Sequence, residues 1–249
     1  MLDLWVLFAL GGVGVVAGFV DAVAGGGGLI ALPALLSVGL SPVAALATNK
    51  AQSVVGTFTA AFTFWRGGFV ALKTMIPGIA FTFVGSYIGA LVVKAIDTSA
   101  LSVAVPVAVI AVALYFSFSP SIKDVDSTAR LKFAIFVPVV GFIIGFYDGL
   151  FGPGTGSFFM LCFVALFGLS ATKASAHTKV LNVTSNLAAL ALFIPAGDVL
   201  WPAAIAMAIG QLIGGYFGAL TGIRFGAKVI RPLVIAVSVI LAIRLLLFP

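Results

Sequence analysis

Two lysines stand in stretches of the chain that are otherwise mostly apolar, and small polar residues recur around each of them at helical spacing. The first stretch, residues 41–57, reads SPVAALATNKAQSVVGT. On a helix Lys50, Ser53 and Thr57 share one face, since positions i, i+3 and i+7 line up, and Asn49 adjoins them. A buried ammonium needs a counter-charge or water. This face is therefore suited to hold a small anion.

The same pattern occurs a second time. Residues 170–186 read SATKASAHTKVLNVTSN, and Lys179, Asn182 and Asn186 fall on the matching face, each 129 positions after its counterpart. Two copies of one polar stripe indicate a single site built from two halves. Both stripes are expected on helices, because Ser41 followed by Pro42 is typical of a helix N-cap with proline at the first helical position.

The composition predicts that these helices lie in a membrane. Hydrophobic residues make up 62% of the 249 residues and charged residues 8%, against roughly 25% charged in soluble domains. The mean hydropathy is +1.29. The apolar runs are helix-length, and the alternation of a membrane barrel is absent. The first run, residues 2–23, contains no basic residue, so we interpret it as a mature span and not a cleaved signal.

Each half of the chain is expected to hold five helical elements, the second too short to cross a bilayer. In the first half these are residues 2–23, 29–39, 41–65, 73–96 and 98–118. In the second half they are residues 133–150, 157–168, 170–195, 199–223 and 228–248. The sequence thus predicts an all-α polytopic membrane protein with a first repeat at 1–118, a hydrophilic linker at 119–132 and a second repeat at 133–249.

The duplication extends beyond the lysine stripes. Asp21 and Asp148 match at an offset of 127, as do the glycine pair 14/18 and the pair 141/145. The segment GSYIGAL at 85–91 matches GGYFGAL at 214–220 at an offset of 129. Such pairs of glycines four residues apart are typical of closely packed membrane helices.

The distribution of basic residues predicts that the two repeats are inverted. Basic residues cluster at 66–73, in the linker and at 224–231, whereas the segment before 199 carries only Asp198. The positive-inside rule makes the three basic segments cytoplasmic. This requires an odd number of crossings per half and places both termini outside the cell.

Glycine-rich breaks precede the two short elements, at residues 25–28 and 152–156. A helix that begins at such a break offers unpaired N–H groups and the positive end of its dipole to an anion. Gly27, Gly28, Gly154 and Thr155 are therefore candidate binding residues. Close helix crossing is an equally good explanation of the glycines.

Three further titratable residues are candidates for ion coupling: Asp21, Asp148 and His177. The alternative for the carboxylates is structural, with Asp21 paired to Lys50 and Asp148 paired to Lys179. His177 occupies the place of Thr48 in the first stripe. With one histidine and one cysteine no zinc site is expected, and no metal or cofactor is predicted.

Four segments resemble the TauE/SafE family of sulfite and organosulfur-anion exporters of prokaryotic inner membranes. They are GFVDAVAGGGGLIALPALL (18–36), SPVAALATNKAQ (41–52), GFYDGLFGPGTGSF (145–158) and KASAHTKVLNVTSN (173–186). The resemblance covers both halves and implies a carrier of small anions such as sulfite or sulfoacetate. The second break reads GPGTG where the first reads GGGG, so the two anion contacts need not be equivalent.

The leading hypothesis is a secondary carrier with one central anion site and alternating access. A passive anion channel and a carrier of small carboxylates are the alternatives. An enzyme is not expected, because no catalytic constellation is present. The expected partners are a small anion and the lipid bilayer, not nucleic acid. The sequence leaves open whether the protein is a monomer or a homodimer.

Overall fold

The computed structural model describes residues 2–97, 99–101, 103–104, 107, 126, 132–226 and 228–229. Within this part of the chain the structure is all-helical. The first half forms α1 (Leu4–Ala24), α2 (Gly27–Ser37), α3 (Pro42–Arg66) and α4 (Leu72–Ala95). The second half forms α6 (Phe133–Leu150), α7 (Thr155–Ala165), α8 (Ala171–Phe193) and α9 (Trp201–Phe225). Most of the predicted spans 98–118 and 228–248 and most of the linker 119–132 lie outside the described residues.

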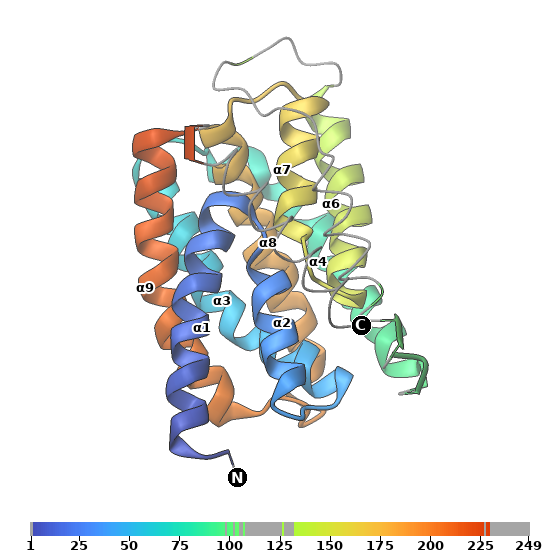
Figure 1. Cartoon of the computed structure of the whole chain (residues 1–249). Coiled ribbons are helices and arrows are strands. Elements are labelled where there is room, and N and C mark those ends of the chain that lie inside the picture. The colour runs from blue at the N-terminus through green and yellow to red at the C-terminus, as the bar shows by residue number, and fades with distance from the viewer. Residues whose placement is uncertain are drawn as a thin grey trace.

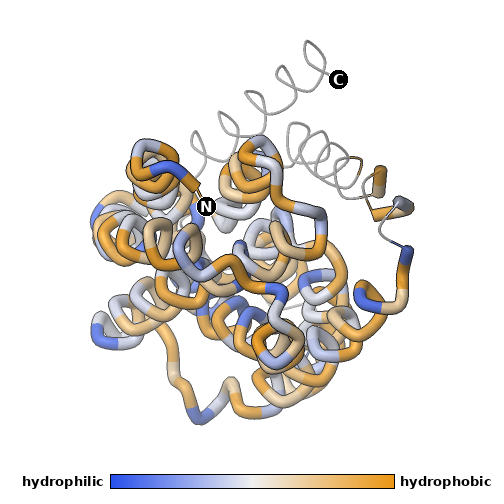
Figure 2. The backbone as a smooth tube through the Cα atoms, turned by 90° about the horizontal axis from the view of Figure 1, so that it is seen from below, coloured by the Kyte–Doolittle hydropathy of each residue, from blue (hydrophilic) through white to orange (hydrophobic). Residues whose placement is uncertain are grey.

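Among the described residues four helices are long and apolar enough to cross a membrane: α1, α4, α6 and α9. Helices α3 and α8 are comparably long, at 25 and 23 residues, but each carries a polar stripe. Large apolar side chains such as Phe8, Ile143 and Ile209 are exposed on the outer surface. Seen along the bundle, most of the backbone belongs to hydrophobic residues, and some hydrophilic stretches lie near the centre of the view (Figure 2). A multi-pass membrane protein is confirmed.

The predicted start of α3 is confirmed. Ser41 is the N-cap, its hydroxyl accepts a hydrogen bond from the Ala44 N–H at 3.4 Å, and Pro42 is the first helical residue. Ser170 stands at the equivalent place before α8, but its side chain makes no capping bond. Its backbone N–H instead donates to the carboxylate of Asp126, which also pairs with Lys173. These two bonds hold the pKa of Asp126 below its usual range.

The glycine breaks produce two short helical hairpins, as predicted. Helix α1 ends at Gly25, which has a φ of 75°, and α2 begins two residues later. Gly154, with a φ of 77°, is the N-cap of α7. Both α2 and α7 have 11 residues, about 16 Å of helix, which is half a bilayer. The predicted short elements, 29–39 and 157–168, each began two residues too late.

The first helix of each half packs along the fourth helix of the other half, and the glycine pairs make this possible. A Cβ placed on Gly14 of α1 would lie 2.4 Å from the Met207 carbonyl oxygen of α9. A Cβ placed on Gly85 of α4 would lie 2.3 Å from the Phe142 carbonyl oxygen of α6. In both helix pairs, later residues of one helix contact later residues of the other. Helices α1 and α9 are therefore parallel, and so are α4 and α6.

The helix directions support the predicted inversion, which remains a prediction. Helix α3 is parallel to α9, because Gly215 packs on Gly56 and Gly222 on Phe64, and a short turn reverses the chain between α3 and α4. Helices α1, α3 and α9 thus run one way while α4, α6 and α8 run the other (Figure 1). Each helix of the second half runs opposite to its counterpart in the first half.

The two ends of the bundle differ in charge. Six basic residues and one carboxylate lie at the end shown uppermost in Figure 1, among the described residues. They are Arg66, Lys73, Lys132, Lys173, Arg224, Lys228 and Asp126. The opposite end carries Asp3, Lys94, Asp97 and Asp198, where Lys94 and Asp198 form an ion pair at 2.7 Å.

Candidate functional site

The two lysine stripes meet in the middle of the bundle. Lys50 of α3 and Lys179 of α8 are each only 1% exposed and rank among the largest fully buried side chains. Their carboxylate partners are buried as well, with Asp148 2% and Asp21 8% exposed. Four formal charges therefore lie inside a membrane protein, which is costly unless each is paired.

The ion pairs cross between the halves of the chain. Lys50 Nζ lies 2.6 Å from Asp148 Oδ1, and Lys179 Nζ lies 2.9 Å from Asp21 Oδ2. The sequence-based alternative paired each lysine with the aspartate of its own half, Asp21 with Lys50 and Asp148 with Lys179, and this pairing is wrong. Each pair instead ties the first half to the second.

The second glycine break lies beside the first lysine. A Cβ placed on Gly152 would be 3.1 Å from Lys50 Nζ and 3.4 Å from Asp148 Oδ1. Asp21 lines the same small cavity as Lys50 and Asp148. The crossed pairing is therefore a choice between neighbouring carboxylates.

The tips of the two hairpins meet at the same place. A Cβ on Gly25 would lie 2.1 Å from the Gly156 carbonyl carbon, and the Ser157 hydroxyl donates to the Ala24 carbonyl at 2.6 Å. Backbone therefore touches backbone where the hairpins cross. The two ion pairs lie immediately beside this crossing, since Asp21 and Asp148 stand in the last turns of α1 and α6.

The aspartates already occupy the starts of the short helices. Asp21 Oδ1 accepts the Gly27 N–H at 3.3 Å, and the Thr155 hydroxyl donates to Asp148 Oδ1 at 2.7 Å. The helix starts thus contact a negative charge of the protein itself, and their contact with a substrate anion stays a prediction.

A small polar cavity of about 20 Å³ lies between the two pairs. A water molecule needs about 10–15 Å³ of such volume, so the cavity has room for about one water. The lining comes from both stripes, both aspartates and both glycine breaks. The lining residues are Asp21, Gly25, Gly28, Asn49, Lys50, Ser53, Thr57, Asp148, Gly152, Thr155, Gly156, Asn182 and Asn186.

Most predicted site residues therefore lie together, and four do not line the cavity. Lys179 adjoins it through Asp21, and Gly27 does so through its N–H bond to the same carboxylate. Gly154 caps α7 outside the lining. His177 is remote: its ring packs against Phe133 and Phe163, and its Nδ1 bonds with the Lys173 carbonyl at 2.8 Å.

Two buried glutamines were missed by the sequence analysis. Gln52 donates to Asn49 Oδ1 at 2.8 Å and to the Ser53 hydroxyl at 3.0 Å, so it orients two lining residues. Gln211 of α9 is 1% exposed, and neither atom of its amide has a partner among the described residues. A lone glutamine inside an apolar helix is itself a signal of an interior position and could have identified Gln211.

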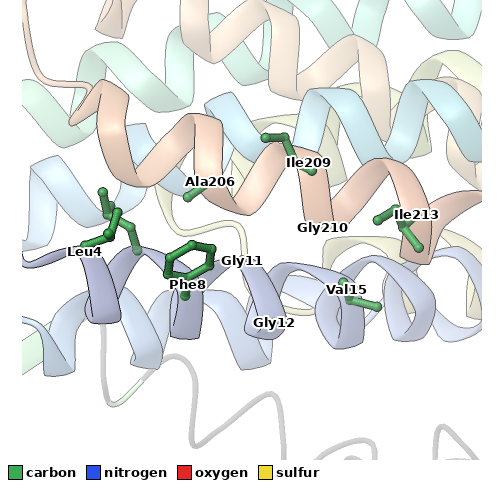
Figure 3. Close-up of a pocket in the computed structure, with 10 residues that line it drawn as sticks. Leu4, Phe8, Gly11, Gly12, Val15, Ala206, Ile209, Gly210 and Ile213 are labelled. Atoms are coloured by element: carbon green, nitrogen blue, oxygen red, sulfur yellow. The ribbon is translucent and has the colours of Figure 1, made fainter.

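A larger hollow on the outside of the bundle is not an anion site. It measures about 380 Å³ and lies between α1 and α9 (Figure 3). Apolar residues such as Leu4, Phe8 and Ile209 line it, and none of its lining side chains is charged. Within the described residues no group of three histidine, cysteine, aspartate or glutamate residues could hold a metal ion.

Comparison with known proteins agrees with a membrane protein of this kind. The family described as "Sulfite exporter TauE/SafE" matches residues 10–245. The chain belongs to this family. It is 44% identical to a "Probable membrane transporter protein ORF9" of Sinorhizobium sp, over 94% of this chain and 90% of that protein.

Two other members are similarly close. The "Probable membrane transporter protein YfcA" of Escherichia coli K12 is 43% identical over 94% of this chain and 87% of its own length. A "Probable membrane transporter protein" of Haemophilus influenzae is 43% identical over 91% of this chain and 89% of its own. No solved structure matches. The chain is a membrane transporter, not an enzyme.

Proposed function

We propose that the protein is a secondary transporter of small anions of the sulfite, organosulfonate or oxyanion class, which bind between Lys50 and Lys179. One observation carries this proposal: two buried lysines are each held by a carboxylate of the opposite half, and Lys50 and both carboxylates line one polar cavity. An anionic substrate can take the place of either carboxylate at its ammonium group. Asn182, Asn186 and Ser53 supply further hydrogen-bond donors.

The small volume of the cavity indicates that parts of the protein must move for a substrate to bind. At about 20 Å³ it is too small for an oxyanion, so binding requires the halves to separate. The crossed pairs and the hairpin tips are the contacts that must open. Separation on one side at a time gives alternating access, and the opposed helix directions in the two halves support a rocking motion of two inverted repeats, 1–118 and 133–249.

The charge distribution supports an orientation. We propose that the basic end, with Arg66, Lys73 and Arg224, faces the cytoplasm of a prokaryotic inner membrane. Both termini then lie outside, and the linker 119–132 lies inside the cell.

Ligand-induced stabilisation tests the substrate class. Purified protein is heated with sulfite, sulfoacetate, sulfate, taurine or small carboxylates, since a ligand of the native state raises the melting temperature by mass action. We expect stabilisation by sulfite or sulfoacetate and none by zwitterionic taurine. Stabilisation by carboxylates alone would favour the carboxylate carrier, and stabilisation by taurine alone would exclude the anion site.

Transport by proteoliposomes tests the mechanism. We expect saturable uptake of sulfoacetate that is stimulated by sulfoacetate inside the vesicles, whereas a passive channel shows no such trans-stimulation. Lys50→Met and Lys179→Met should each abolish uptake. Lys173→Met is the matched control, because Lys173 lies on the same helix as Lys179 but pairs with the exposed Asp126. Normal uptake by both site variants would exclude the lysine site.

A further inference from the structure

The site is electrically balanced when closed. It contains two ammonium groups and two carboxylates, which form two crossed ion pairs beside the hairpin crossing. Four other titratable groups lie on the same helices. Tyr147 donates its hydroxyl to the Pro153 carbonyl at 2.7 Å, His177 lies in its aromatic cluster, and Arg66 and Lys173 lie at the basic end of the bundle. None of them lines the cavity, and α2, α7 and α9 add no titratable lining residue.

An anion that enters this balanced site leaves it negatively charged. The substrate displaces a carboxylate from its lysine but cannot expel it, because the carboxylate belongs to a membrane helix. An ionised carboxylate without a counter-charge in a desolvated site is strongly unfavourable. Protonation of the carboxylate restores the balance without a counter-ion.

We infer that the protein moves protons together with its anion, one proton for each negative charge, and that Asp148 and Asp21 carry them. This inference rests on the proposed function and deepens it. A proton from water on the entry side converts the displaced carboxylate to a neutral acid and leaves to water on the exit side. No bond of the anion breaks. Transport is therefore electroneutral.

The geometry assigns the first proton to Asp148. Its Oδ1 holds both Lys50 Nζ and the Thr155 hydroxyl, whereas its Oδ2 is buried with no partner among the described residues. In Asp21 both oxygens are engaged, Oδ1 by the Gly27 N–H and Oδ2 by Lys179. Asp148 thus has an oxygen ready to accept a proton before any protein contact breaks.

Proton uptake on binding tests this inference directly. The full-length protein in detergent is titrated with sulfoacetate, whose two charges stay fixed from about pH 6 to about pH 8, in weak buffer with a pH dye. We expect about two protons taken up per bound sulfoacetate, and about one in Asp148→Asn or Asp21→Asn. Asp198→Asn is the matched control, because this aspartate also pairs with a lysine but lies at the bundle end. It should keep the wild-type value.

The affinity of the unmodified protein gives a second readout that does not depend on folding of a variant. If binding takes up protons, the Kd for sulfoacetate rises with pH, by up to about tenfold per pH unit for each proton. A Kd that is equal at about pH 6 and about pH 8, or binding without proton uptake, would overturn the coupling and leave the anion carrier intact. Failure of both sulfoacetate and sulfite to bind would overturn the proposed function and the coupling with it.

Discussion

A lysine in the middle of a membrane helix costs at least about 2.5–3.5 kcal/mol to insert, and this chain bears that cost twice. The structure shows how it is offset: each ammonium lies within 2.9 Å of a carboxylate contributed by the other half of the chain. Structural ion pairing and anion binding were alternative explanations of the lysines. With crossed pairs they become compatible, because the contact that stabilises the closed state is also the one that a substrate would replace.

Double variants at these residues test the crossing. Lys50→Met leaves Asp148 buried without its counter-ion, so we expect a loss of about 3–5 kcal/mol of stability. Adding Asp148→Asn should recover most of that loss, since no unpaired charge then remains. Adding Asp21→Asn should instead lower stability further, because it strands Lys179 as well. Thermal unfolding in detergent measures all three, and rescue by Asp21→Asn would contradict the crossed pairing.

Gln211 offers a second test at the residue scale. Its amide is pressed between Gly18 and Gly56 without a hydrogen-bond partner among the described residues. A buried amide in this state costs about 1–3 kcal/mol, so Gln211→Met should raise the melting temperature. Gln52→Met is the contrasting variant, because Gln52 uses its amide to bind Asn49 at 2.8 Å. This variant should lower the melting temperature. A destabilised Gln211→Met would show that the amide is satisfied.

At the scale of the elements, the hairpins α1–α2 and α6–α7 decide where the charges lie. Each hairpin ends at a glycine-rich tip, and the tips cross with backbone in contact. The glycines were explained before either by anion contact or by close crossing. The crossing of Gly25 and Gly156 supports the second explanation at these two positions, while Gly28 lines the cavity.

A pair of alanine substitutions separates packing from backbone strain at the tip. Gly25 and Gly197 have nearly the same φ, 75° and 73°, but only Gly25 has atoms within 4 Å of its Cβ position. Alanine at either position should lower the stability by about 1–3 kcal/mol, because a residue with a Cβ is strained in the left-handed conformation. Gly25→Ala should cost clearly more than Gly197→Ala in thermal unfolding, because it forces the tips apart, and it should impair transport. Equal losses would mean that the crossing is loose.

Local sequence signals were sufficient to predict the elements but not their partners. Ser41 and Pro42 fixed the start of α3, and the glycine runs predicted two half-length helices to within two residues. The two polar stripes around Lys50 and Lys179 predicted residues that line the small polar cavity. The partner of each lysine could not be predicted, because periodicity places a residue on a face but does not say how high it lies relative to another helix. The position of His177 could not be predicted for a related reason, because the sequence shows that the residue is polar but not that aromatic side chains surround it.

For the molecule as a whole, the proposed inversion agrees with the crossed pairs, since each pair joins two helices that run in opposite directions, α1 with α8 and α6 with α3. In the proposed cycle one pair opens while the other still holds the halves together. The proposed inversion would also explain why the basic residues gather at one end although the halves share their pattern, since equivalent turns of the two halves lie at opposite ends of the bundle (Figure 1).

Labelling from each side of the membrane tests this arrangement. Ala71 precedes α4 and Ala196 lies between α8 and α9, so these exposed alanines occupy corresponding turns of the two halves. In a Cys162→Ala background, Ala71→Cys should react only with a reagent that reaches the cytoplasm, and Ala196→Cys with an impermeant reagent added outside. Two parallel repeats would place both cysteines on one side, and labelling of both by the impermeant reagent would exclude inversion. That result would also remove the basis for the proposed alternating access by two inverted repeats.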